Sequence, residues 1–146
     1  MKCLWLVALF LGLSSLASAQ ICLVYPGSTG AIPTVQITAH PRAGQDVGYF
    51  VGSFPSGSGD WVLFVTSRTR WQYRPFNADS DLCVGPIFTR RGLRQVPNAT
   101  GAFTGFFPSN GILPGEKIFI QMWYTDWAVP PGFRVNFSRV LTRTFI

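Results

Sequence analysis

The stretch Leu113-Pro-Gly-Glu-Lys-Ile-Phe-Ile-Gln-Met-Trp-Tyr-Thr-Asp126 decides the fold. Its Pro-Gly pair predicts a turn, and the residues that follow predict a long strand, because side chains alternate between the two faces of an extended chain. One face is largely apolar and carries Ile118, Ile120, Met122 and Tyr124. The other is mixed and carries Lys117, Phe119, Gln121 and Trp123. We expect the first face to be buried and the other strands to pack around this one.

Residues 1–19 have the composition of a cleaved signal peptide. Lys2 precedes an apolar run from Leu4 to Leu13, and Ala17-Ser-Ala19 matches the A-x-A cleavage pattern. The run is short for spanning a bilayer. We therefore expect a secreted single domain over 20–146, located outside the cell, on its surface or in the periplasm, with no membrane span.

Two cysteines, Cys22 and Cys83, remain after the expected cleavage. In an oxidising compartment, an isolated pair most simply forms a disulfide bond. The bond would close a loop of about 60 residues and contribute roughly 4 kcal/mol in the chain-entropy treatment. The alternative is two buried thiols too far apart to bond.

Short extended runs recur between Gly- and Pro-rich turns, and no helical pattern appears after residue 19. The runs lie at 34–39, 47–54, 61–66, 82–84, 102–107, 113–126 (after its Pro-Gly turn), 133–137 and 140–146. This pattern predicts an all-β fold, an antiparallel immunoglobulin-like β-sandwich of about seven strands. A closed barrel is the alternative. Gly48 and Gly52 predict a bulge or close packing in the second run.

The order and spacing of several residues resemble the pattern shared by a known group of proteins. The matching residues are Cys22, Pro33, Cys83-Val84, Leu113, Gly115, Ile118-Phe-Ile-Gln121, Trp123, Asp126 and Ser138. Together they resemble small uncharacterised secreted proteins of planctomycetes and related bacteria, over most of 22–146. The resemblance implies a β-sandwich outside the cytoplasm and supplies no activity. This chain differs from that group in its many arginine and aromatic residues.

The sequence offers no credible catalytic or metal-binding pattern. His40 is the only histidine, and no G-x-S-x-G motif accompanies it. The expected disulfide would occupy both thiols, and no clustered zinc ligands occur. Asp79-Ser-Asp81 lacks the glycine and closing acid of a calcium loop and is interpreted as a solvated turn. We expect neither an enzyme, nor a metal site, nor a cofactor.

Basic and aromatic residues carry the binding signal. Without Lys2, eleven basic residues oppose six acids for a net charge of +5, and ten of the eleven are arginine. Arginine suits planar contacts with acidic groups, and aromatic faces stack on sugar rings. The candidate ligand-binding residues are Arg68, Arg70, Trp71, Tyr73, Arg74, Trp123 and Trp127. The alternatives are a merely basic surface and aromatic side chains that fill the core.

These patterns predict a secreted, non-enzymatic β-sandwich with a structural, adhesive or protein-interaction role and an extracellular protein as partner. The alternative is a carbohydrate-binding module that uses the aromatic and arginine-rich loops to bind acidic polysaccharide. A nucleic-acid partner is not expected for an exported chain.

Overall fold

The computed structural model describes residues 22–24, 32–54, 60–74, 80–96, 101–126 and 134–146. Within these ranges all regular structure is extended, so the all-β prediction is confirmed. No helix in the described part of the chain is long and apolar enough to cross a membrane. Residues 1–19, Asp79 and Trp127, to which predictions were attached, lie outside the described residues.

The described residues form ten strands, where the sequence predicted about seven. They are β1 (Thr34–Ile37), β2 (Asp46–Gly52), β3 (Trp61–Ser67), β4 (Arg70–Tyr73), β5 (Leu82–Val84), β6 (Thr89–Gln95), β7 (Phe103–Pro108), β8 (Lys117–Asp126), β9 (Arg134–Phe137) and β10 (Leu141–Thr144). Both β4 and β6 run through arginine-containing stretches whose exposed side chains gave no apolar alternation.

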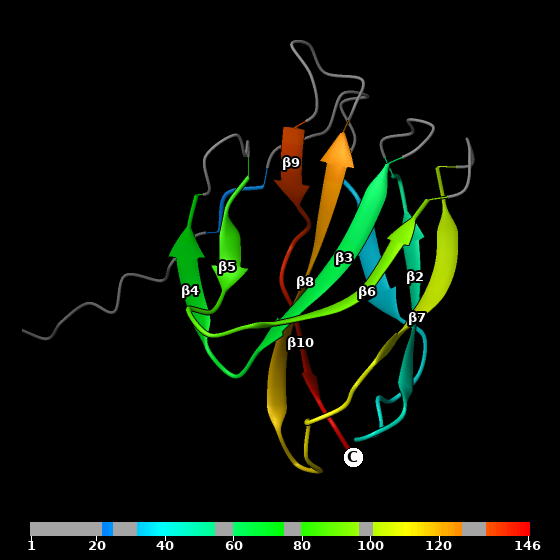
Figure 1. Ribbon diagram of the computed structural model, residues 1–146, viewed down its shortest axis with the longest axis vertical. Helices are drawn as coiled ribbons and strands as arrows, with labels where there is room; N and C mark the ends of the chain where they lie inside the picture. The colour runs from blue at the N-terminus through cyan, green and yellow to red at the C-terminus, as the bar shows by residue number, and fades with distance from the viewer. Residues whose placement is uncertain (1–21, 25–31, 55–59, 75–79, 97–100, 127–133) are drawn as a thin grey trace, which may run out of the picture.

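The strands pair in three antiparallel sheets (Figure 1). One has the order β1-β2-β7, a second has the order β10-β8-β3-β6 with β9 also paired to β8, and β4 pairs with β5 in a third. The ten-residue strand β8 pairs with β3, β10 and β9, as expected of the organising strand. The sheets are separate in the described residues, so the strands do not close into one barrel there.

The core lies between the two larger sheets. Ile118, Ile120, Met122 and Tyr124 are all buried, which confirms the predicted face of β8. Aromatic rings bridge the sheets, with the ring centroid of Phe64 4.4 Å from that of Tyr49 and 4.9 Å from that of Phe107. Such ring contacts add to the stabilisation from buried apolar area.

A third layer covers part of the opposite face of the five-stranded sheet. The β4–β5 pair contributes Leu82 and Val84 to a second apolar cluster, which also holds Val65 and Phe137. Trp123 and Phe119 pack against this cluster and are only half-buried. The predicted mixed face of β8 is therefore largely covered, which the sequence did not indicate.

Gln121 explains how a polar side chain fits under this layer. It is buried, and its Oε1 accepts a hydrogen bond from Cys83 N at 2.8 Å. Its Nε2 donates to Asp81 O at 2.9 Å and to Ser138 O at 2.7 Å. One amide thus satisfies three backbone groups and fastens β5 to β8, as burial of polar groups requires.

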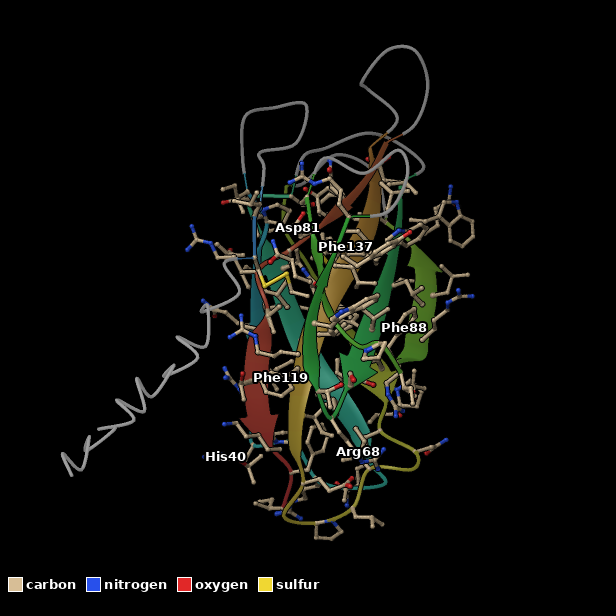
Figure 2. The ribbon with its side chains drawn as sticks, turned by 90° about the vertical axis from the view of Figure 1, so that its left-hand side faces the viewer. His40, Arg68, Asp81, Phe88, Phe119 and Phe137 are labelled. Carbon is tan, nitrogen blue, oxygen red and sulfur yellow. A yellow bond between two sulfur atoms is a disulfide. The ribbon has the colours of Figure 1, made fainter. Side chains whose placement is uncertain are left out.

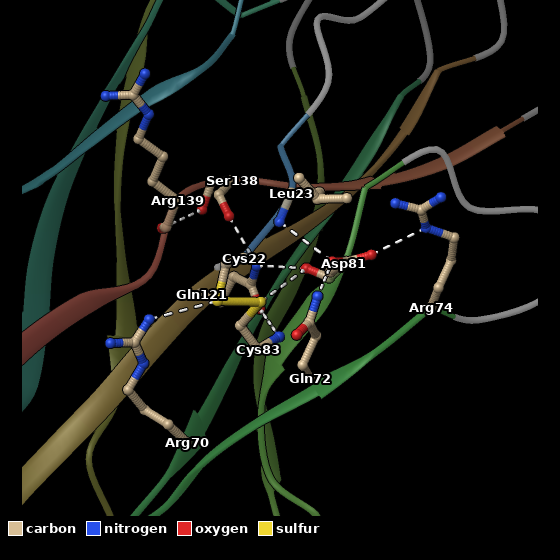
Figure 3. Close-up of a disulfide and its surroundings, with 10 residues drawn as sticks. All are labelled: Cys22, Leu23, Arg70, Gln72, Arg74, Asp81, Cys83, Gln121, Ser138 and Arg139. Carbon is tan, nitrogen blue, oxygen red and sulfur yellow. Dashed lines mark hydrogen bonds and ion pairs between the residues drawn. A yellow bond between two sulfur atoms is a disulfide. The ribbon is translucent and has the colours of Figure 1, made fainter. Parts of the chain in front are cut away.

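The predicted disulfide between Cys22 and Cys83 is present, with 5.9 Å between the Cα atoms (Figure 3). It ties the segment before β1 to β5. The alternative of two separated thiols is therefore wrong.

Asp81 lies beside the disulfide and is buried, so its interpretation as part of a solvated turn is wrong. Its carboxylate accepts hydrogen bonds from Leu23 N, Gln72 Nε2 and Arg74 Nε at 2.8–3.1 Å. Burial alone would raise the pKa of Asp81, but the bonds from Gln72, Leu23 and Arg74 outweigh it and lower the pKa.

The glycines of β2 permit close packing, one of the two predicted outcomes. A Cβ atom at Gly48 would lie 2.6 Å from Thr38 Oγ1 and 3.3 Å from the Phe106 ring. At Gly52 it would lie 3.0 Å from Thr34 Oγ1 and 3.1 Å from the Phe50 ring. Side chains from neighbouring positions therefore cover both glycines on the outer face of the sheet.

Candidate functional site

A groove of about 760 Å³ opens between the β4–β5 pair and the outer face of the five-stranded sheet. We call it the aromatic groove. It is lined by Leu63, Val65 and Trp123 from the sheet, Trp71 and Tyr73 from β4, and Phe88, Arg90 and Leu93 from the segment that includes β6. Apolar side chains therefore dominate it, as is usual in ligand sites.

Trp71 and Tyr73 give the groove its most exposed aromatic surface. Both belong to β4, and both line the groove. Their rings are parallel within 3°, with centroids 5.5 Å apart, and the residues are 40% and 48% exposed. This pair lies on the surface and is not part of the core between the two larger sheets.

Trp123 brings the long strand β8 to the same groove. It lies opposite Leu63 in the β3–β8 register, and both residues face the groove. Three of the four aromatic candidates predicted from the sequence thus lie at one place. Trp127, the fourth, lies outside the described residues.

None of the three predicted arginines lines the groove, because each has another contact. Arg70 Nη2 lies 3.4 Å from Cys22 Sγ, and Arg74 pairs with Asp81 at 2.9 Å (Figure 3). Their contacts with the disulfide and with Asp81 hold the Arg70 and Arg74 side chains outside the lining of the groove.

Arg68 is held by Glu116 through two hydrogen bonds, Nε to Oε1 at 2.7 Å and Nη2 to Oε2 at 2.9 Å. Figure 2 places Arg68 toward the end of the molecule away from Asp81. Hydrogen bonding to Arg68 lowers the pKa of Glu116, and the same contact raises the pKa of Arg68. Arg68 therefore fastens the 109–116 turn and lies away from the aromatic pair.

Arg90 and Arg91 are the basic residues among those that line the groove, and neither was among the sequence candidates. Arg90 is the exposed one. It lies opposite Val65 in the β3–β6 register, and its guanidinium carbon is 6.0 Å from the centroid of the Phe88 ring. Among the described residues no carboxylate pairs with Arg90. Recognition of β6 as a strand would have placed Arg90 on the same sheet face as Val65.

Arg91, the next residue, is held by hydrogen bonds to other parts of the chain. It is buried and donates to Thr66 Oγ1 at 2.7 Å, Pro108 O at 2.7 Å and Asn110 O at 2.9 Å. Burial first, and the charge of Arg68 second, lower the pKa of Arg91. These bonds join β6 to the end of β7 and so close the open edge between the two larger sheets.

A bulge in β6 follows Arg91 and includes Gly92, which lines the groove. The β3–β6 register shifts between Val62 and Phe64, and Gly92 adopts φ of +60°. That left-handed conformation favours glycine. The bulge therefore belongs to the construction of the groove wall.

Two other kinds of chemistry, metal binding and catalysis by His40, depend on which side chains lie together. In the described ranges, no group of three or more His, Cys, Asp or Glu side chains could hold a metal ion. His40 is exposed and lies toward the end of the molecule away from Asp81 (Figure 2).

No protein-family model, curated protein or solved structure matches this chain. The resemblance to secreted planctomycete proteins therefore stays a prediction, and function is inferred from the groove.

Proposed function

We propose that this protein is a secreted, non-enzymatic β-sandwich that binds an extracellular protein through the aromatic groove. The observation that carries the proposal is the exposed, stacked pair Trp71 and Tyr73 beside an apolar sheet face. Exposed apolar patches mark protein contacts, and Trp, Tyr and Arg are the residues that most often dominate binding energy.

The groove suits an extended segment that carries an apolar side chain next to an Asp or Glu. The apolar side chain would leave water against Leu63, Trp71 and Trp123. The carboxylate would face Arg90, for which the described residues supply no acidic partner. The net charge of +5 on residues 20–146 also attracts acidic segments.

The backbone of β4 gives such a segment a second means of attachment. In the described residues β4 pairs only with β5, so its other edge carries no strand. An extended peptide can add to an exposed sheet edge through main-chain hydrogen bonds while its alternate side chains enter pockets. Trp71 and Tyr73 would then contact the side chains that face the groove.

Export is supported by the signal-like pattern of residues 1–19 and by the Cys22–Cys83 disulfide, which suits an oxidising compartment. N-terminal sequencing of the protein recovered outside the producing cells tests this. We expect a mature chain that begins at Gln20. A chain that retains Met1 would contradict export by signal cleavage.

We also propose an immunoglobulin-like arrangement of the two larger sheets. The orders β1-β2-β7 and β10-β8-β3-β6 support it. In chain order, the strands pass from the first sheet (β1, β2) to the second (β3, β6), return to the first (β7) and end in the second (β8, β10), as in a Greek-key sandwich. The β4–β5 pair and β9 would then be additions to that frame. Backbone NOEs that failed to link β2 with β7 would contradict it.

Selection from a displayed random-peptide library tests the binding proposal. We expect enriched peptides to carry an aromatic or aliphatic residue beside an Asp or Glu. Their binding should be lost in Trp71→Ala and weakened in Arg90→Gln. Phe106→Ala is the matched control, because Phe106 is 69% exposed on the other large sheet and does not line the groove. Absence of enrichment, or equal loss in the control, would contradict the proposal.

Acidic polysaccharide is a second candidate for the same groove. Aromatic rings stack on sugar faces, and Arg90 beside the Trp71–Tyr73 pair could contact a carboxylate or sulfate. An array of neutral, carboxylated and sulfated glycans separates the two candidates. Binding of acidic glycans that Trp71→Ala abolishes, without peptide enrichment, would favour the polysaccharide.

A further inference from the structure

A second hollow, of about 650 Å³, lies where an edge of each large sheet carries no further strand from the described residues. It is formed by residues 37–41, at and after the end of β1, and by residues 142–144 of β10. Strand β1 is at the edge of the three-stranded sheet, and β10 is at the edge of the five-stranded sheet. We call this site the basic hollow.

Arg143 occupies an unusual position in β10. It lies opposite the buried Ile118, and its neighbours at the same parity, Leu141 and Phe145, belong to or pack against the core. The half-buried Arg143 therefore lies on the inward face of an edge strand. Its Nη1 donates to Thr142 O at 2.8 Å, and no carboxylate among the described residues pairs with it.

The surroundings of Arg143 supply donors and no acid. The hollow is lined by His40, Arg143, Thr38, Thr142 and Thr144, and no Asp or Glu among the described residues lines it. Lys117 lies opposite Thr144 in the β8–β10 register and adds positive charge close by. A partly buried cation without a counter-ion is costly, and an anion held by these donors would relieve that cost.

We propose that the basic hollow binds a tetrahedral oxyanion, sulfate or phosphate, either free or as the ester group of a larger ligand. Arg143 is the principal ligand through its guanidinium. His40, which lines the same hollow, is the second donor. The site is separate from the aromatic groove, and its test does not depend on the function proposed for that groove.

Titration of the ¹⁵N-labelled protein, followed by NMR at constant ionic strength, tests the proposal. The probes are sodium sulfate, sodium phosphate and a sugar sulfate ester, with sodium chloride as the reference salt. We expect saturable shifts at His40, Thr142 and Thr144 with the oxyanions only. A stronger response to the sugar sulfate than to inorganic sulfate would identify the ester as the source.

Two arginine variants test whether sulfate binding depends on Arg143 itself or on the overall positive charge. Arg143→Gln should weaken sulfate binding about tenfold or more, as expected for loss of a charge-assisted hydrogen bond. Arg139→Gln is the matched control, because Arg139 is exposed and does not line the hollow. His40→Ala should weaken sulfate binding severalfold. Because His40 is exposed, this variant replaces Arg143→Gln as the test if Arg143→Gln does not fold. Shifts that never saturate, that appear equally with chloride, or that decrease equally in both arginine variants would overturn the proposal.

Discussion

Replacement of Gln121 by leucine tests whether one buried amide holds the β4–β5 pair on the sheet. Leucine has a similar size and keeps the space filled, but it removes all three hydrogen bonds that the amide makes. Cys83 N–H and the carbonyl groups of Asp81 and Ser138 would then lack these partners. Because Gln121 is 1% exposed, water cannot readily replace the amide.

The expected loss follows from those three bonds. A typical intramolecular hydrogen bond contributes about 0.5–1.5 kcal/mol net, and an unsatisfied buried group costs about 1–3 kcal/mol. Burial of the leucine side chain offsets part of this. We therefore expect Gln121→Leu to lower the free energy of unfolding by about 3 kcal/mol, or by roughly 10 °C in Tm for a domain of this size.

Urea denaturation followed by circular dichroism measures the loss, with Gln95→Leu as the matched control. Gln95 lies on β6 and is exposed, so its replacement should change stability by less than about 0.5 kcal/mol. Hydrogen exchange at Cys83 N–H should also accelerate in Gln121→Leu. If the two variants unfold at the same urea concentration, the amide does not fasten the pair and the reasoning fails.

Three further substitutions test other parts of the frame. Replacement of Cys22 and Cys83 by alanine should lower unfolding free energy by about 4 kcal/mol for the 61-residue separation; an unchanged urea midpoint would contradict this. The lowered pKa of Asp81 contributes stability that is complete above its unfolded pKa of about 3.9 and is lost as pH falls through the folded pKa. As pH is lowered, the urea midpoint should therefore fall less in Asp81→Asn than in the wild type. Arg91→Met should cost about 2 kcal/mol by thermal denaturation, whereas exposed Arg139→Met should stay within about 0.5 kcal/mol; similar losses would refute the structural role of Arg91.

The buried face of β8 was predictable because its signal is local. Every second residue from Ile118 to Tyr124 is largely apolar, and an extended chain places such residues on one side. The disulfide was predictable by count, since Cys22 and Cys83 are the only cysteines after residue 19. Neither inference required knowledge of which strands pair.

The third layer was not predictable because it depends on contacts between distant residues. Four consecutive residues of β4 are exposed, so the strand has no apolar alternation. Its pairing with β5 places both strands over β8, where Gln121 becomes buried. A glutamine between Ile120 and Met122 predicts an outward polar position unless the covering layer is known.

The candidate site was also predictable only in part. Trp71 and Tyr73 were selected for their residue type, and the structure brings them to one groove with Trp123. Proximity in sequence predicts that Arg70 acts with them, but its side chain lies against Cys22 and does not line the groove. Arg90 comes from a strand 17 residues beyond Tyr73, and only the β3–β6 register places it near them.

The arginines show why net charge alone is a weak guide to what this protein binds. Several are engaged within the protein, bonding to carboxylates or backbone carbonyls: Arg68, Arg74, Arg91 and Arg94. Their charge still contributes to long-range attraction, which salt screens. Arg90 and Arg143 line hollows, and among the described residues their side chains have no carboxylate partner and no bond to a distant part of the chain: Arg143 donates to the adjacent Thr142 carbonyl. A ligand attracted by charge alone would therefore respond similarly to replacement of any exposed arginine. A ligand recognised locally would respond to Arg90→Gln or to Arg143→Gln, and only to the variant at its own site.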